Sequence, residues 1–120
     1  MSDLATKPRQ QVVIDLLFHA LRVKDAALNE HAAEVFRQLD TDTVRRLVRE
    51  AAWKRNSPAY RLRVLGVIER VEQLSGPDDW LELNIIAADR NPKIRHAAMR
   101  CLVRHGAGGS QAATAAGTGA

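Results

Sequence analysis

Apolar residues recur along this chain at the three- and four-residue spacing of amphipathic helices, and short polar breaks separate the runs. The period-two alternation that indicates strands is not found in the sequence. The spacing predicts six helices. The first, second and fourth cover about 10–22, 25–39 and 58–71. The third follows the polar caps at 40–42 and ends near 55, the fifth begins at 77 and the sixth begins at 92.

Each predicted helix has a stripe of apolar residues that we expect to face the core. In the first helix the expected stripe is Val13, Leu16, Leu17, Ala20 and Leu21. In the third and fourth helices it is Val44, Leu47, Val48, Ala51, Tyr60, Val64, Val67, Ile68 and Val71. Ile94 and Cys101 are expected to face inward from the sixth helix.

Helix ends are marked by capping residues and by proline. Ser57-Pro58 and Asn91-Pro92 each place an N-cap residue before proline at the first helical position, where the missing N–H is not needed. Asp25 is a further expected N-cap, and Gly76 is expected to end the fourth helix in the left-handed conformation. Because the connections are short, consecutive helices are expected to form antiparallel hairpins.

The fourth and sixth helices repeat one another at an offset of 34 residues. Pro58 aligns with Pro92, and Arg61 aligns with Arg95. A period of this size is typical of a helical array, although a plain helical bundle remains an alternative.

The segment from Asp89 to Ala98 resembles the core of a HEAT repeat, with an Asp in the turn, Pro92 opening the second helix and Arg95 after Ile94. The resemblance implies an all-α fold, an α-solenoid of three antiparallel helical hairpins. It also implies that Arg61 and Arg95 make structural pairings between neighbouring hairpins. The second hairpin has Arg55 where the third has Asp89, which puts the Asp–Arg pairing there in doubt. The first hairpin lacks both the proline and the arginine and would be a degenerate or capping repeat.

Composition divides the chain into three parts. Residues 106–120 contain only Gly, Ala, Ser, Thr and Gln and are expected to form a disordered tail, because they offer no large apolar side chain to bury. Residues 1–9 are expected to be a flexible N-terminus, and residues 10–105 the folded domain. With one cysteine, no signal-peptide pattern and no long apolar run, the chain is expected to be cytoplasmic and not to enter a membrane.

Charge is segregated along the chain. Residues 45–70 hold eight basic and two acidic side chains, residues 72–89 hold five acidic side chains, and residues 90–104 hold five basic ones. At 3.6 residues per turn, the helical repeat predicts one stripe made of Arg63, Arg70, Arg100 and Arg104. In HEAT arrays the second helices line the concave face, so the resemblance implies a basic concave face there.

Candidate chemistry is weak elsewhere. The acidic residues Asp78, Asp79, Glu82 and Asp89 have no accompanying His or Cys in their segment, so no metal site is expected. His19, His31, His96 and His105 lack zinc-ligand spacing and are expected to be surface residues. Trp53 is expected to pack at the core or at a hairpin edge, the alternative being a stacking platform beside basic charge. No catalytic triad, phosphate loop or cofactor motif is found, so no cofactor is expected.

These observations favour a non-catalytic protein-interaction or scaffold module that binds an acidic protein surface or peptide. The alternative is a nucleic-acid-binding helical protein that uses the same arginines. Self-association is a further expectation, because an array has two ends that a partner can cover.

Overall fold

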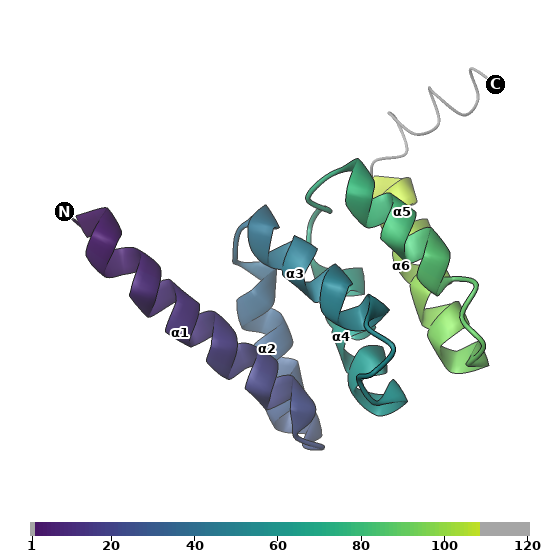
Figure 1. The fold of residues 1–120 in the computed structure, drawn as a ribbon, viewed down its shortest axis with the longest axis horizontal. Helices are drawn as coiled ribbons and strands as arrows, with labels where there is room; N and C mark the ends of the chain where they lie inside the picture. Colours follow the sequence, from purple (N-terminus) through teal and green to yellow (C-terminus); the bar gives the residue numbers. More distant parts are fainter. Residues whose placement is uncertain (1, 109–120) are drawn as a thin grey trace.

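The computed structural model describes residues 2–108, and these form six α-helices with no β-strand among them (Figure 1). The protein is therefore all-α over its described length. The helices are α1 (Ser2–Arg22), α2 (Ala26–Arg37), α3 (Thr41–Ala52), α4 (Pro58–Arg70), α5 (Pro77–Ile86) and α6 (Pro92–Gly108).

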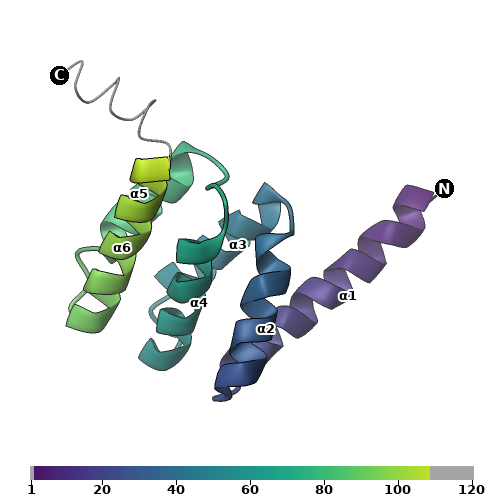
Figure 2. The same ribbon diagram turned by 180° about the vertical axis from the view of Figure 1, so that it is seen from behind.

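The helices lie in two layers. Helices α1, α3 and α5 face the viewer in Figure 1, and α2, α4 and α6 face the viewer in Figure 2, which shows the opposite side. Helix α3 packs against both α4 and α5, and α4 packs against α2 and α6. Helix α1 packs mainly against α2, and its N-terminal end projects away from the other helices (Figure 1).

Side-chain caps explain where the helices begin. The Asp25 carboxylate accepts the Leu28 N–H at 3.1 Å, and the Ser57 hydroxyl accepts the Tyr60 N–H at 3.2 Å. The Asn91 side-chain oxygen accepts the Lys93 N–H at 2.9 Å. Each bond satisfies an N–H that has no partner within its own helix, so the predicted N-caps are confirmed.

Two predicted helix ends are wrong. Helix α3 ends at Ala52 rather than near Arg55, because the Asn56 side chain donates to the Glu50 carbonyl oxygen at 2.9 Å and replaces a further helical bond. Gly76 does not end a helix in the left-handed conformation. Helix α4 has already ended at Arg70, and Gly76 is extended and stands at the N-cap position of α5.

The chain ends also differ from prediction. Helix α1 begins at Ser2, so residues 2–9 are helical where a flexible N-terminus was expected. Helix α6 continues to Gly108, three residues into the expected tail, and residues 109–120 lie outside the described part of the chain. Among the described helices, none has the length and low polarity needed to cross a membrane.

The core confirms the predicted faces of α3 and α4, whose expected inward residues are all buried. Ile94 and Cys101 are also fully buried. The prediction for α1 is right in part: Leu21 is buried and Leu17 and Ala20 pack against the core, but Val13 and Leu16 are exposed and Phe18 is buried in their place. Helix α1 is apolar around most of its circumference, so periodicity does not single out one face.

Contacts with other elements decide the orientation of α1. The Phe18 ring meets the Phe36 ring edge-on, with centroids 5.0 Å apart. The Arg46 guanidinium lies over the Phe18 ring at 4.4 Å. The aromatic residue therefore occupies the inward position, and the smaller Val13 remains outside.

We expect Ile94→Asp to unfold the α5–α6 pair, because it buries an unpaired carboxylate at a fully enclosed position. The penalty is about 3 kcal/mol or more, a large share of the stability of a small domain. Thermal unfolding followed by circular dichroism measures it. His96→Asp, at an exposed position of the same helix, is the control. Equal melting temperatures for the two variants would contradict the position assigned to Ile94.

Candidate binding surface

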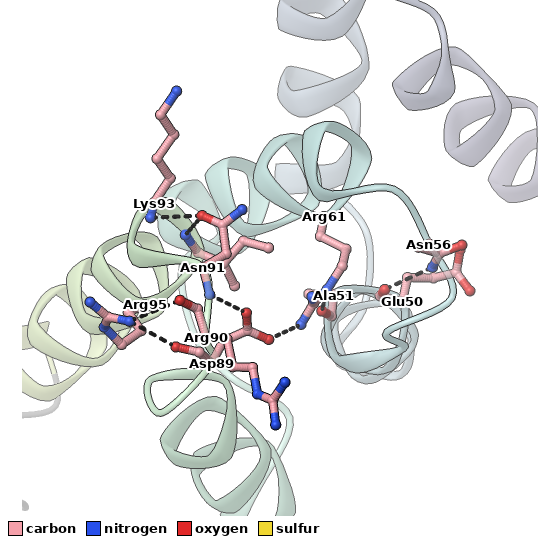
Figure 3. A network of polar contacts seen from close by, with 10 residues as sticks. Glu50, Ala51, Asn56, Arg61, Asp89, Arg90, Asn91, Lys93 and Arg95 are labelled. Atoms are coloured by element: carbon pink, nitrogen blue, oxygen red, sulfur yellow. Dashed lines mark hydrogen bonds and ion pairs between the residues drawn. The ribbon is translucent and has the colours of Figure 1, made fainter.

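The α3–α4 and α5–α6 pairs are joined by a buried ion pair (Figure 3). Nη2 of Arg61, on α4, lies 2.9 Å from Oδ1 of Asp89, in the α5–α6 turn. Nε of the same guanidinium donates to the Ala51 carbonyl oxygen at 2.7 Å. Both side chains are less than one-tenth exposed. Arg61 thus makes a pairing between neighbouring helical pairs, of the kind expected at its position in the repeat.

Asp89 is held in its charged form by this arrangement. Burial alone would raise the pKa of the carboxyl group, but the Asn91 N–H and the Arg61 guanidinium outweigh burial and lower the pKa below 3.8. The Asn91 N–H donates to Oδ2 at 2.9 Å, so each carboxylate oxygen has a partner. Asp89 is therefore a structural residue and not part of an exposed acidic patch.

A second arginine joins α1 to the α3–α4 pair. Nη2 of Arg22 donates to the Asn56 side-chain oxygen at 3.1 Å and lies 3.5 Å from Glu50 Oε1. Its guanidinium also lies 4.0 Å from the centroid of the Tyr60 ring. Sequence reasoning missed this junction, and only the polar Asn56 beside the Ser57-Pro58 break hinted at it.

Arg95 differs from the pairing expected of it. Nη1 donates to the carbonyl oxygens of Asp89 and Arg90, both at 3.1 Å, in the turn of its own helical pair (Figure 3). It does not bridge two pairs. Helix α6 packs against α4 and α5, and no further described helix brings a carboxylate to the Arg95 side.

Two of the four predicted stripe arginines are used within the fold. Nη1 of Arg63 donates to the Leu21 carbonyl oxygen at 3.0 Å, near the C-terminal end of α1. Arg70 forms ion pairs with Glu30 at 2.5 Å and Glu34 at 3.0 Å, both on α2. These two side chains therefore connect α4 to the first two helices. Two carboxylates compensate the charge of Arg70, whereas Arg63 bonds to a neutral carbonyl.

The other two arginines line a shallow groove on the face formed by α4 and α6. The groove has a volume of about 450 Å³ and is lined by Glu69, His96, Met99, Arg100, Val103 and Arg104. Arg100 contacts Glu69 through Nε at 3.3 Å and stays more than half exposed. Among the described residues, no carboxylate lies within ion-pair distance of Arg104. The groove therefore combines an apolar floor, Met99 and Val103, with a rim in which one acid, Glu69, stands against the basic side chains of Arg100 and Arg104.

The predicted acidic patch is not one surface. Asp79 is buried, and its carboxylate accepts the Ser75 N–H at 2.8 Å and also bonds to the Ser75 hydroxyl. Asp89 is buried on Arg61, which leaves Asp78 and Glu82 on the outer side of α5. Among the described residues, no group of three or more His, Cys, Asp or Glu could hold a metal ion.

Cys101 is buried, as predicted, and burial raises the pKa of its thiol to about 12. Its Sγ lies 3.2 Å from the Leu65 carbonyl oxygen, so the thiol is a packing group without nucleophilic character at neutral pH. Of the two positions expected for Trp53, the core is wrong, because the residue is 53% exposed; Trp53 is the C-cap of α3, at the edge of the α3–α4 pair.

His105 is buried against α4, which corrects its expected surface position. Its Nε2 lies 2.6 Å from the Ile68 carbonyl oxygen. Burial lowers the pKa of the imidazole below 6.5, helped by Arg104 and opposed by the Ile68 hydrogen bond and Glu69. The apolar pattern missed it because a histidine on an inward face has no signal of its own. The other three histidines are exposed.

Comparison of the chain with protein-family models, with curated protein sequences and with solved structures gave no significant match. Function is therefore inferred from the surface of the chain itself.

We expect Asp89→Asn to lower the free energy of unfolding by about 3 kcal/mol or more, because it leaves the buried Arg61 guanidinium without its counter-charge. Urea unfolding at pH 7 measures the change. Asp78→Asn, an exposed acid in the first turn of α5, should change it by less than about 1 kcal/mol. A similar loss in both variants would show that the Arg61–Asp89 pair has no special importance.

The buried imidazole predicts a pH dependence of stability. Because the pKa of His105 is lower in the folded than in the unfolded chain, its neutral form stabilises the fold above about pH 6.5, and this stabilisation is lost as the pH falls below that value. The melting temperature should therefore decrease between pH 7.5 and pH 5.5. His105→Gln, whose amide can still donate to the Ile68 carbonyl, should reduce this decrease, whereas His96→Gln should not. An unchanged pH profile in His105→Gln would contradict the assignment.

Proposed function

We propose that this protein is a non-catalytic interaction module, a short HEAT-like array that binds an acidic protein partner on the face formed by α4 and α6. The observation that carries the proposal is the groove in which Met99 and Val103 lie between Arg100, Arg104 and His96. Such a surface suits a partner segment that presents apolar side chains flanked by carboxylates.

Two observations favour a protein over a nucleic acid as the partner. A phosphate backbone is best recognised by a continuous track of free basic side chains. Here Arg63 and Arg70 already bond to α1 and α2. The floor of the groove is also apolar, which adds affinity for side chains but not for a phosphate backbone.

The HEAT-like reading is supported by the contacts between successive helical pairs. Helix α3 packs on α5 and α4 packs on α6, so the third pair repeats the layer order of the second. The Arg61–Asp89 pair joins them at a position that the 34-residue repeat specifies. The first pair fits this pattern least, since α1 diverges from the layer and is joined through Arg22 instead.

The test compares two fluorescent probes: a synthetic helical peptide with leucines spaced four apart between glutamates, and a duplex DNA of similar charge. We expect the peptide to bind near 0.15 M salt and Arg100→Ala/Arg104→Ala to weaken it about 3- to 10-fold, since each exposed charge contributes up to about 1 kcal/mol. Fluorescence anisotropy measures both.

The matched control is Lys54→Ala/Arg55→Ala, which removes the same charge from the exposed α3–α4 turn and should leave peptide binding unchanged. Salt-steep DNA binding that is lost in the arginine variant, together with no peptide binding, would replace the proposal with the nucleic-acid alternative. Peptide binding that is equally weakened in both variants would place the interaction outside the groove.

A further inference from the structure

One stripe of α4 is buried at the junction with the α5–α6 pair. Its residues are Arg61, Leu65 and Ile68, which follow one another at the i, i+4, i+7 spacing of a single helical stripe. Leu65 and Ile68 are fully buried, and Arg61 is 4% exposed. The carbonyl oxygens of Leu65 and Ile68 bond to α6, and Arg61 bonds to the turn that precedes it.

The 34-residue repeat places an equivalent stripe on α6. Arg61, Leu65 and Ile68 correspond to Arg95, Met99 and Leu102. The chemical character is the same, an arginine followed by two large apolar side chains. The two stripes differ in exposure. Met99 is 51% exposed while Leu65 is fully buried, and Arg95 and Leu102 are only partly covered. Helix α6 thus presents outward the kind of surface that α4 buries.

Arg95 makes as many side-chain bonds as Arg61, but both of them stay within its own helical pair. Arg61 bonds to a carbonyl of its own helical pair and to a carboxylate of the next one. Arg95 bonds to two carbonyls of its own pair and to no carboxylate among the described residues. The missing bond is the one that, at Arg61, crosses to the neighbouring pair.

We propose that the Arg95–Met99–Leu102 edge of α6 is a docking surface for a helical hairpin of a partner protein, with a carboxylate in the partner's interhelical turn that pairs with Arg95. The interface would continue the one that α4 makes with the α5–α6 pair, with the partner's second helix lying on Met99 and Leu102. This surface shares Met99 with the groove but is recognised through Arg95 rather than through Arg100 and Arg104, and the inference does not depend on the proposed acidic ligand there.

A two-fold dimer through α6 does not suit the edge. In a two-fold contact through α6, each edge would face its own equivalent. Residues 90–104 hold five basic side chains and no acidic one, so such a contact would bring like charges together without a carboxylate for Arg95. The occupant must supply the acid.

The edge can be tested with a hairpin of known structure. A second copy of residues 73–106 is inserted directly after Gly106 in the full chain, so that the 34-residue register continues and the copy of Asp89 comes opposite Arg95. We expect one cooperative thermal transition, with a melting temperature at least about 5 °C above that of the parent. Met99→Glu should remove most of this gain and change the melting temperature of the parent by less than about 2 °C. Arg95→Gln should also remove most of the gain, measured against the parent that carries the same substitution, because Arg95 bonds to its own turn in both chains.

Val12→Glu is the control, because Val12 has a similar exposure to Met99 and lies on α1, away from α6. It should leave the gain intact. Two separate transitions in the extended chain, the main one at the parent's melting temperature, would overturn the proposal. The proposal would also be overturned if the extended chain kept its higher melting temperature in the Met99→Glu variant. If light scattering shows the parent to be a dimer that Met99→Glu converts to a monomer, the occupant is a second copy and the proposed partner is wrong.

Discussion

The Arg61 guanidinium lies between two helical pairs, bonded to the Ala51 carbonyl on one side and to the Asp89 carboxylate on the other. A buried arginine without these partners would strongly destabilise the fold, so the distance between α4 and the α5–α6 turn is constrained by one side chain. Two further contacts of the same junction need this spacing: the Cys101 thiol and the His105 imidazole of α6 lie against carbonyl oxygens of α4. The groove on the α4–α6 face exists only because these two helices are held at this spacing.

Arginine serves the same purpose elsewhere in the molecule. Arg22 connects α1 to the α3–α4 turn, and Arg63 and Arg70 connect α4 to the first two helices. A basic side chain reaches across a helix boundary more easily than an apolar one, because its long stem packs while its planar head bonds to carbonyls and carboxylates. Much of the positive charge in the middle of the chain is therefore structural. Of the basic side chains that remain exposed, Arg100 and Arg104 on α6 lie beside an apolar surface.

Two surfaces remain without a partner after these arginines have bonded within the fold. The groove between α4 and α6 keeps exposed arginines beside an apolar floor, which suits a flexible acidic segment. The outer edge of α6 repeats the pattern of a buried interface, which suits a folded helical partner. The two surfaces meet at Met99 but recognise their partners through different arginines, so variants at Arg95 and at Arg104 distinguish them.

The sequence by itself determined the helix count, the N-caps, the core faces of α3 and α4 and the repeat position of Arg61. These depend on local backbone sterics, on bonds within one turn and on a strong period, all of which act between near neighbours in the chain. Only the tertiary structure decided the inward face of α1, the burial of His105, the Arg22–Asn56 contact and the partners of Arg63 and Arg70. Each depends on which helices meet, and a long side chain can reach any of several neighbours. Such pairings are set by contacts between residues 18 to 42 positions apart, which helical spacing does not encode.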